Sequence, residues 1–520
     1  MRKFFLSLAF AVSLLCCCSK TPETPVTPTP SAPTAITLSP TSLSAAQAAA
    51  SYDLTITAPA RPTLTLPAWI TKTDGTYKDY KITFKLNVAA NDSYEPRSAD
   101  VVVKATGAAD VTLKVTQAAK EVINDPTLPD NAAVARTLEL GLGWNMGNHF
   151  DAYAGGVASE TAWQGKKATQ ATFTGLKAKG FTSVRIPATW MGHIGEAPDY
   201  TLDEEWLGRI YQVVGWAEDA GLNVILNTHH DEDHGENDGN HWQNLKGAVD
   251  NEEVNTQVKA EIAAVWGQIA TKFKDKGDFL MLESFNELIY GGEWSSSSNT
   301  EKKCAVINEW NQVFVDAVRA TGGNNATRWL GVPGYAASPN YLKYLTVPND
   351  PAKKTMLAFH CYDPYDYTIR EDLNPNDDIN DHLWVPPVDW GHTGTSMPKG
   401  EEQIKELFNS IYTNYIAKNI PIYMGEFGCS MRNKNDTKAW AYYKYYLEYF
   451  VKASRVFGIA GFLWDNGADG YGQERHGYID HGTGAYTANG QEPVEAMVKA
   501  WSTTDASYTL QSVYDSAPVF

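Results

Sequence analysis

Between residues 136 and 520, short apolar segments alternate with longer amphipathic ones, and this alternation limits the possible folds most strongly. Strands that alternate with helices predict a parallel sheet, because each helix returns the chain to the same edge. The predicted strands are 140–145, 183–187, 223–228, 279–285, 329–332, 355–360, 420–426 and 459–464. The predicted helices include 203–220, 254–273, 306–320, 401–417 and 437–453.

Nearly every predicted strand ends in polar side chains. In chain order the strand ends are Asn145, Arg185, His229 with His230, Asn286 with Glu287, Pro333, His360 with Tyr362, Glu426, and Trp464 with Asp465 and Asn466. Eight such strands within about 390 residues predict an α/β fold, a (β/α)8 TIM barrel, whose active site lies at the carboxyl ends of the strands. A doubly wound open sheet is the alternative, and the ring of polar strand ends disfavours it.

Two of the predicted strands share one design. Residues 279–287 and 420–428 each contain an apolar run that ends in a glutamate, Glu287 or Glu426. A single glutamate in this place could merely cap a helix or pair with an arginine. Two of them, facing one another across a barrel mouth, indicate a retaining glycoside hydrolase, in which one acid protonates the leaving oxygen and the other attacks the anomeric carbon.

The neighbouring side chains suit the same chemistry. An asparagine beside the acid, Asn286, can bind the sugar 2-hydroxyl, while Arg185 and Tyr362 can keep the nucleophile ionised and oriented. The histidines can hold the acid and the sugar hydroxyls, and Trp464 offers a surface on which the reacting sugar stacks.

Seven motifs resemble glycoside hydrolase family 5, and most closely its subfamily 4. They are Gly-Trp-Asn-Met-Gly-Asn at 143–148, Val-Arg-Ile-Pro at 184–187, Leu-Asn-Thr-His-His at 226–230, Asn-Glu at 286–287, His-Cys-Tyr-Asp-Pro-Tyr at 360–365, Gly-Glu-Phe-Gly at 425–428 and Trp-Asp-Asn-Gly at 464–467. The resemblance covers residues 138–503. It implies that Glu287 is the acid/base and Glu426 the nucleophile. The substrate-binding residues that we infer with it are Asn145, Asp151, Arg185, His229, His230, Asn286, His360, Tyr362 and Trp464.

Two positions depart from the family pattern. His149 stands where many members have threonine, and Cys361 stands where an aromatic residue is usual. Neither change removes a catalytic group, so both bear on how the substrate fits.

The resemblance implies a retaining endo-β-1,4-glucanase that acts on a β-glucan polysaccharide, and the lipoprotein layout described below favours xyloglucan. The alternatives on the same barrel are a mixed-linkage β-glucanase or cellulase, a β-mannanase and a xylanase. A non-catalytic surface glycan-binding protein is the alternative from another class. It would lack a carboxylate or part of the arginine and histidine shell, and this chain keeps them all.

The run from His229 to His234 has the composition of a metal site. However, adjacent histidines on a strand point to opposite faces, and the barrel already uses one of them. We therefore expect no metal and no cofactor. The scattered cysteines Cys304, Cys361 and Cys429 predict no disulfide framework. The tryptophans that fall in or near the loops after the strands are candidate sugar platforms: Trp163, Trp190, Trp206, Trp294, Trp384 and Trp390.

The first 17 residues resemble a bacterial lipoprotein signal. Arg2 and Lys3 precede an apolar run that ends in three cysteines, and Cys17 is the expected lipidation site. The lipid would anchor the protein to the outer membrane, at the cell surface, without spanning it. Residues 18–33 are rich in proline and threonine and predict an extended stalk.

Residues 34–120 carry short alternating strands at 35–38, 52–57, 80–88, 99–105 and 109–117, which predict a small all-β, immunoglobulin-like sandwich. Trp69, Asn91, Arg97 and Gln117 and their neighbours resemble the BACON domain of polysaccharide-degrading proteins, and we interpret this sandwich as a spacer. A linker at 121–135 leads to the barrel at 136–520. The formal net charge of −18 excludes nucleic acid as a partner. We expect a monomer.

Overall fold

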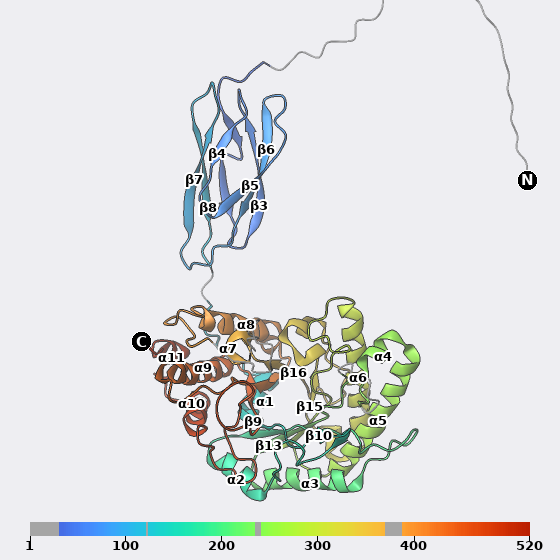
Figure 1. Ribbon diagram of the computed structural model, residues 1–520. Coiled ribbons are helices and arrows are strands. Elements are labelled where there is room, and N and C mark those ends of the chain that lie inside the picture. The colour runs from blue at the N-terminus through green and yellow to red at the C-terminus, as the bar shows by residue number, and fades with distance from the viewer. Residues whose placement is uncertain (1–30, 121–122, 234–240, 370–386) are drawn as a thin grey trace, which may run out of the picture. The chain divides into compact units, whose positions relative to one another are not determined.

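The computed structural model describes residues 31–120, 123–233, 241–369 and 387–520 (Figure 1). The chain divides into two compact units, Met1–Val122 and Ile123–Phe520. The predicted lipoprotein signal with Cys17 lies outside the described residues, and so does Trp384. In the described part of the chain, no helix is both long and apolar enough to cross a membrane.

The second unit is a closed barrel of eight strands, which confirms the predicted (β/α)8 fold and excludes the open sheet. The strands follow one another around the ring in the order β12-β13-β14-β15-β16-β17-β18-β9, and every neighbouring pair is parallel. Their bounds are β9 Leu142–Met146, β12 Ser183–Ile186, β13 Asn223–Asn227, β14 Leu280–Glu283, β15 Leu330–Pro333, β16 Thr355–Cys361, β17 Ile422–Phe427 and β18 Ala460–Asp465. Each of the eight predicted strands overlaps one of them.

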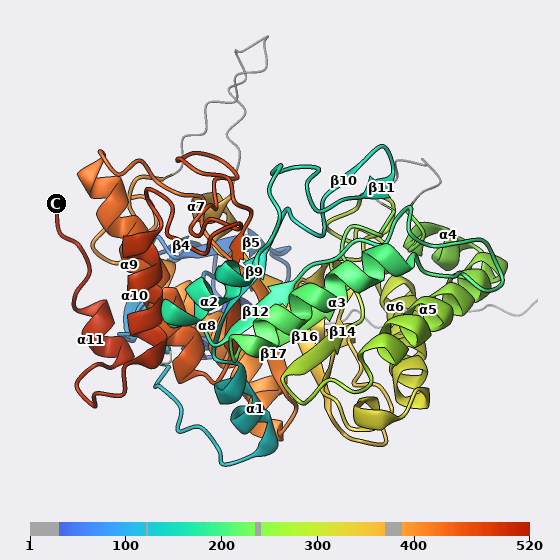
Figure 2. The same ribbon diagram turned by 90° about the horizontal axis from the view of Figure 1, so that it is seen from below.

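Helices surround this ring of strands (Figures 1 and 2). The described helices of the unit are α1 Ala132–Leu140, α2 Gln170–Ala178, α3 Glu204–Asp219, α4 Leu245–Asp250, α5 Glu252–Phe273, α6 Thr300–Ala320, α7 Tyr365–Thr368, α8 Gly400–Asn414, α9 Thr437–Val456, α10 Gln491–Ser502 and α11 Leu510–Tyr514. A short hairpin, β10 Tyr153–Ala154 with β11 Val157–Ala158, follows β9. Helix α6 begins six residues before its predicted start.

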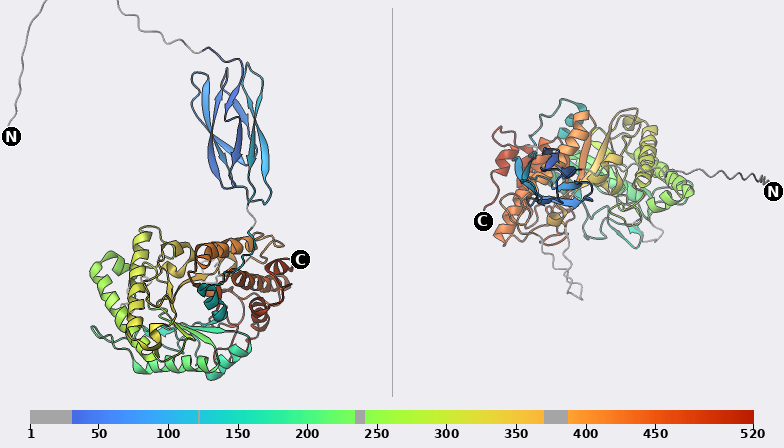
Figure 3. Two further views of the ribbon diagram at one scale, coloured as in Figure 1. Left: turned by 180° about the vertical axis from the view of Figure 1, so that it is seen from behind. Right: turned by 90° about the horizontal axis from the view of Figure 1, so that it is seen from above.

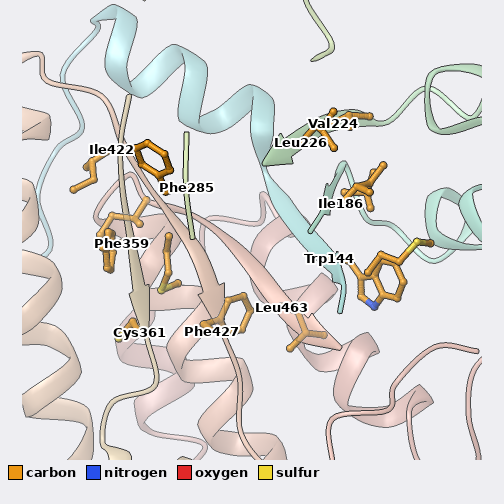
Figure 4. Close-up of a cluster of buried hydrophobic side chains, with 14 of the residues drawn as sticks. Trp144, Ile186, Val224, Leu226, Phe285, Phe359, Cys361, Ile422, Phe427 and Leu463 are labelled. Atoms are coloured by element: carbon orange, nitrogen blue, oxygen red, sulfur yellow. The ribbon is translucent and has the colours of Figure 1, made fainter. Parts of the chain in front are cut away.

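Successive side chains along each strand point alternately into one of two apolar clusters, because neighbouring residues of a strand face opposite sides. Side chains such as Ile186, Leu226 and Phe359 belong to the large core that also contains the apolar faces of the helices (Figure 4). Side chains on the other face of the strands form a second cluster together with Leu140, the last residue of α1; its strand members are Ile225, Met281, Met356, Ala358, Tyr423, Ala460 and Phe462. These positions pack together inside the ring of strands.

Toward the carboxyl ends of the strands, the inward-facing side chains become polar. Asn145, Arg185, Asn227 and Glu283 are each two residues further along their strands than Gly143, Ser183, Ile225 and Met281, respectively, and all four are buried. The apolar cluster therefore supports a buried polar layer from below, and this layer carries the candidate site.

The first unit is an all-β sandwich, as predicted (Figure 3). Its sheets have the orders β1-β3-β6-β5 and β2-β8-β7-β4. The bounds are β1 Thr37–Ser39, β2 Ser42–Ala45, β3 Ala50–Thr57, β4 Thr63–Thr65, β5 Ile70–Asp74, β6 Lys81–Val88, β7 Arg97–Lys104 and β8 Val111–Gln117. The sequence did not indicate β2, β4 or β5. Trp69 packs against the sandwich core, and the Arg97 guanidinium lies 4.5 Å from its ring centroid.

Gly143 of β9 provides a test of packing inside the barrel. A Cβ at this position would overlap the ring of Phe462 on the paired strand β18. Overpacking of this kind costs about 1–3 kcal/mol. We therefore expect Gly143→Ala to lower the melting temperature in calorimetry, and Phe462→Leu added to it to recover part of the loss.

Gly267→Ala is the matched control. Gly267 lies inside α5 with open space around its Cα, so alanine should stabilise the helix by about 0.5–1 kcal/mol. Equal melting temperatures for Gly143→Ala and the unchanged protein would show that the barrel interior is looser than this packing implies.

Candidate active site

The buried guanidinium of Arg185, on β12, is the centre of the candidate site. All five of its N–H groups have an acceptor. Nε and Nη2 donate to Glu283 Oε1 at 3.0 and 2.6 Å, and Nη2 also donates to Asn286 Oδ1 at 3.0 Å. Nη1 donates to Asn145 Oδ1 at 3.0 Å and to Glu426 Oε1 at 2.8 Å. One side chain thus fixes residues from β9, β14 and β17.

The charge of Arg185 depends on these partners. Burial alone would lower the pKa of Arg185, but the carboxylates of Glu283 and Glu426 outweigh burial and raise that pKa. Asn145 is held in turn, because its Nδ2 donates to the carbonyl oxygens of Gly425 at 2.9 Å and Phe462 at 3.1 Å. The arginine is therefore a fixed cation that no water needs to solvate.

Glu426 lies at the end of β17 with several partners for its carboxylate. The Tyr362 hydroxyl donates to Oε2 at 2.8 Å, while Arg185 holds Oε1. Burial raises the pKa of Glu426 above its usual value, and the charges of His360 and Arg185 and the hydrogen bond from Tyr362 offset part of that rise. These contacts favour the ionised carboxylate and fix its orientation, as a nucleophile requires.

Glu287 follows β14, and one of its oxygens lies 2.6 Å from His360 Nδ1. Burial disfavours the charged form of His360, but the carboxylates of Glu426 and Glu287 outweigh burial and raise the pKa of this histidine. An oxygen of Glu287 and an oxygen of Glu426 lie within 4.8 Å of each other, with His360 beside both. This short spacing fits the carboxylate pairs of retaining glycosidases, whose carboxyl groups are about 5–5.5 Å apart.

Trp464, at the end of β18, is almost completely buried by its neighbours. Its ring stacks on the imidazole of His229, with centroids 5.8 Å apart and planes 6° from parallel. Asn227 Nδ2 lies 3.2 Å from His229 Nδ1 and fixes the tilt of that ring. Burial and the neighbouring cations His230 and Arg185 hold the pKa of His229 well below its usual value, so the imidazole is neutral.

The structure corrects the predicted directions of His229 and His230. Their rings are not on opposite faces: the centroids are 4.5 Å apart, and both Nε2 atoms face Asp151 Oδ2, at 4.0 and 3.7 Å. The prediction was wrong because β13 ends at Asn227, so the alternation of a strand does not continue through the two histidines. Asp151 itself accepts from the backbone N–H groups of Asn148 and His149, at 2.9 and 2.6 Å.

His230 is a cation at this edge of the site. Burial lowers its pKa, but the carboxylates of Glu232, Asp151 and Glu426 overcome burial and raise the pKa of His230 to about 9. A positive side chain beside a neutral His229 gives the pocket a polar wall suited to sugar hydroxyls.

A pocket of about 180 Å³ opens between the two glutamates and Trp464. Its lining combines predicted site residues with three that the sequence analysis did not single out: Ile369, Glu474 and His476. Glu474 and His476 follow β18 at a distance that no motif marks. Burial lowers the pKa of His476 to about 4, which leaves its imidazole neutral.

Two further residues were missed for another reason. Glu283 and Asn227 lie within the apolar runs of β14 and β13, where a polar residue attracts little notice. The alternation of the strands could have revealed them. Each lies on the inward face of its strand, two residues beyond a residue of the second apolar cluster.

The described tryptophan candidates fall into an exposed group and a buried group. Trp163 and Trp294 are 43% and 53% exposed. Trp190, Trp206 and Trp390 are buried, because each packs against the core of the barrel unit. His149 is buried also, and its Nε2 lies 3.2 Å from Glu160 Oε1, so it supports the wall rather than the cleft.

The three cysteines of the described residues, Cys304, Cys361 and Cys429, are buried and free. Burial raises the pKa of Cys429 to about 11, so its thiol is uncharged at neutral pH.

A closed (β/α)8 barrel with two differently held carboxylates at the carboxyl ends of its strands defines a glycoside hydrolase. Comparison with known families agrees, since residues 148–470 match the model for cellulase, glycosyl hydrolase family 5. The chain belongs to glycosyl hydrolase family 5. Residues 63–118 match the BACON model, described as a putative N-terminal binding domain.

Relatives extend over most of the chain. Endoglucanase A of Ruminococcus albus is 36% identical over 360 residues, which cover 68% of this chain and 89% of the relative. A xyloglucan-specific endo-β-1,4-glucanase of Bacteroides ovatus is 30% identical, over 76% of this chain and 79% of the relative. The solved structure of a GH5-4 broad specificity endoglucanase from Bacteroides salanitronis is 43% identical, with a TM-score of 0.66, and covers 74% of this chain and 99% of that chain.

From the hydrogen bond between Tyr362 and Glu426 we predict how the pH dependence of kcat/KM changes in a variant. The bond lowers the pKa of Glu426, so Tyr362→Phe raises it. If only the ionised Glu426 attacks, the acidic limb of kcat/KM should move to higher pH, by about half a unit to one unit. The measurement is the pH dependence of kcat/KM on a β-glucan oligosaccharide.

Tyr443→Phe is the control, because the buried Tyr443 hydroxyl bonds to Tyr478 and to neither carboxylate. An acidic limb that stays in place in Tyr362→Phe, or moves to lower pH, would argue against Glu426 as the group that must ionise.

Proposed function

We propose that the protein is a retaining endo-β-1,4-glucanase in which Glu287 is the acid/base and Glu426 the nucleophile. The observation that carries this proposal is the carboxylate pair, whose oxygens lie within 4.8 Å of each other and whose partners differ. Two carboxyl groups this close leave no room for a water between them and the sugar, as an inverting enzyme would need.

The contacts support this division of roles. Glu426 is 6% exposed and bonded to Arg185 and Tyr362, which keep it charged and aimed. Glu287 is 19% exposed and lies against His360. An acid/base must exchange its proton with an incoming water, so the more accessible carboxyl group suits that role.

The reaction then has two steps. Glu287 gives its proton to the glycosidic oxygen while a Glu426 oxygen attacks the anomeric carbon, so that the C–O bond to the leaving sugar breaks as the bond to Glu426 forms. Glu287 next takes a proton from water, and the resulting hydroxide displaces Glu426 from the anomeric carbon. In this proposal Asn286, which Arg185 holds, binds the 2-hydroxyl, and Trp464 stacks under the sugar.

For the substrate we propose xyloglucan, and membership of subfamily 4. The relative from Bacteroides ovatus bears a xyloglucan-specific name and aligns with 76% of this chain. The broad specificity named for the Bacteroides salanitronis structure makes mixed-linkage glucan and cellulose the principal alternatives. The role of the sandwich as a spacer and a lipid anchor at Cys17 on the outer membrane stay predictions from the sequence.

Substrate choice is tested by the release of reducing sugar from xyloglucan, barley β-glucan, carboxymethylcellulose, mannan and xylan by the purified protein. We expect the highest kcat/KM on xyloglucan. Preference for an unbranched glucan would change the proposed substrate but not the proposed mechanism. Preference for mannan would identify the protein as a mannanase instead of a glucanase. Release of no reducing sugar from any of the five would favour a glycan-binding protein.

The roles of the two glutamates are tested by alanine variants on two substrates. Glu287→Ala should slow polysaccharide cleavage by about 100-fold or more, but spare an aryl cellobioside whose leaving group needs no proton. Glu426→Ala should lose both activities and still bind the polysaccharide in calorimetry. Wild-type polysaccharide cleavage by Glu287→Ala would contradict the assignment of the acid.

A further inference from the structure

A third carboxylate, Glu283, is buried beneath the reacting pair. It ends β14, four residues before Glu287, and is 1% exposed. Oε1 accepts from Arg185 Nε and Nη2 at 3.0 and 2.6 Å and from Asn227 Nδ2 at 3.0 Å. Oε2 accepts from the hydroxyl of Tyr423. A carboxylate this deep and this fully bonded cannot touch a sugar, so it acts on the reaction through its partners, and of these Arg185 is the one that bonds to Glu426.

The geometry shows what Glu283 does to the arginine. It holds Nε and one N–H of Nη2, the edge of the guanidinium that lies away from Glu426. The other N–H groups then face Asn286, Asn145 and Glu426. A planar fork held along one edge cannot rotate, so its remaining donors stay aimed.

We propose that Glu283 is a positioning residue, which fixes the Arg185 guanidinium and shares its charge, so that Arg185 orients Glu426 without over-stabilising the carboxylate. The inference rests on the proposed function, because it takes Glu426 as the nucleophile. An arginine with Glu426 as its sole counter-ion would bind that carboxylate more strongly and make it a weaker nucleophile. A second carboxylate on the same cation weakens this hold while leaving the geometry intact.

Other charged or titratable groups face these two carboxylates. Around Glu283 they are Arg185 and Tyr423. Around Glu426 they are Arg185, Tyr362, His360, Glu287 and His230. None of these is altered in the variants of the test, so a change in the pH profile reports on Glu283.

Glu283→Gln separates charge from shape. The amide oxygen can still accept from Arg185 and Asn227, and the amide N–H can donate to the Tyr423 hydroxyl, so the network keeps its geometry. The negative charge is gone, which should lower the pKa of Glu426. On 2,4-dinitrophenyl β-cellobioside, which needs no acid, we expect the acidic limb of kcat/KM to move about one unit to lower pH. In the same variant kcat should fall while KM changes little.

Glu283→Asp keeps the charge and withdraws it by one methylene from Arg185. It should lower kcat by about 10- to 100-fold at every pH, with its acidic limb near that of the unchanged enzyme. This variant keeps the inference testable even if Glu283→Gln does not fold. Wild-type kcat in Glu283→Asp contradicts the inference.

Glu401→Gln is the matched control. Glu401 is equally buried, and it accepts from His392 and from the Tyr445 hydroxyl, each at 2.9 Å, away from the pocket. It should change the melting temperature and leave the pH profile in place. A Glu283→Gln profile that superimposes on the wild-type one, as a purely structural carboxylate predicts, overturns the inference.

The proposed function and the positioning role of Glu283 can be refuted separately. If the unchanged enzyme hydrolyses neither the aryl cellobioside nor any β-glucan, the proposed function falls and the inference falls with it. If the unchanged enzyme is active and only the Glu283 variants behave like Glu401→Gln, the function stands and the positioning role alone is wrong.

Discussion

The site depends on one buried cation. A guanidinium removed from water is stable only if its charge and all of its N–H groups find partners, and Arg185 makes five hydrogen bonds to four side chains. Those side chains come from β9, β14 and β17 and from the loop after β14, so the arginine ties together one side of the barrel mouth. Loss of any one acceptor would leave a buried donor unpaired. The same contacts that stabilise the arginine therefore fix where Glu426 and Asn286 lie.

The barrel makes this arrangement possible through its alternation. In the lower part of the barrel the inward-facing side chains of the strands are apolar, and Ile225, Met281 and Phe462 fill the interior there. The next inward positions are polar, and they meet only because the ring is closed. The two glutamates, which have an oxygen within 4.8 Å of each other, occupy different surroundings: Glu426 is bonded to Arg185 and Tyr362, and Glu287 is more open beside His360. Different surroundings are what separates a nucleophile from an acid/base.

Much of this could be predicted from the sequence, because short apolar runs locate the strands and their polar ends locate the rim. Glu287, Glu426 and Arg185 were found in this way, and the structure brings them together. The directions of His229 and His230 were not predictable, since they depend on where β13 stops. Glu283 escaped notice because its partner Arg185 is 98 residues away and only the closed ring joins them. Trp190 and Trp390 fall in loop-like sequence, yet the packing buries them. The strands β2, β4 and β5 are short, with serine and threonine in place of a clear apolar run.

The central claim is that Glu426 forms a covalent bond to the sugar, and the most direct measurement is to trap that bond. A 2-deoxy-2-fluoro-cellobioside with a good leaving group slows the second step more than the first, so that the glycosyl-enzyme accumulates. Peptide mass spectrometry of the inactivated protein should place the fluorinated sugar on the peptide that contains Glu426. A label on Glu287, or turnover with inverted product and no label, would contradict the account.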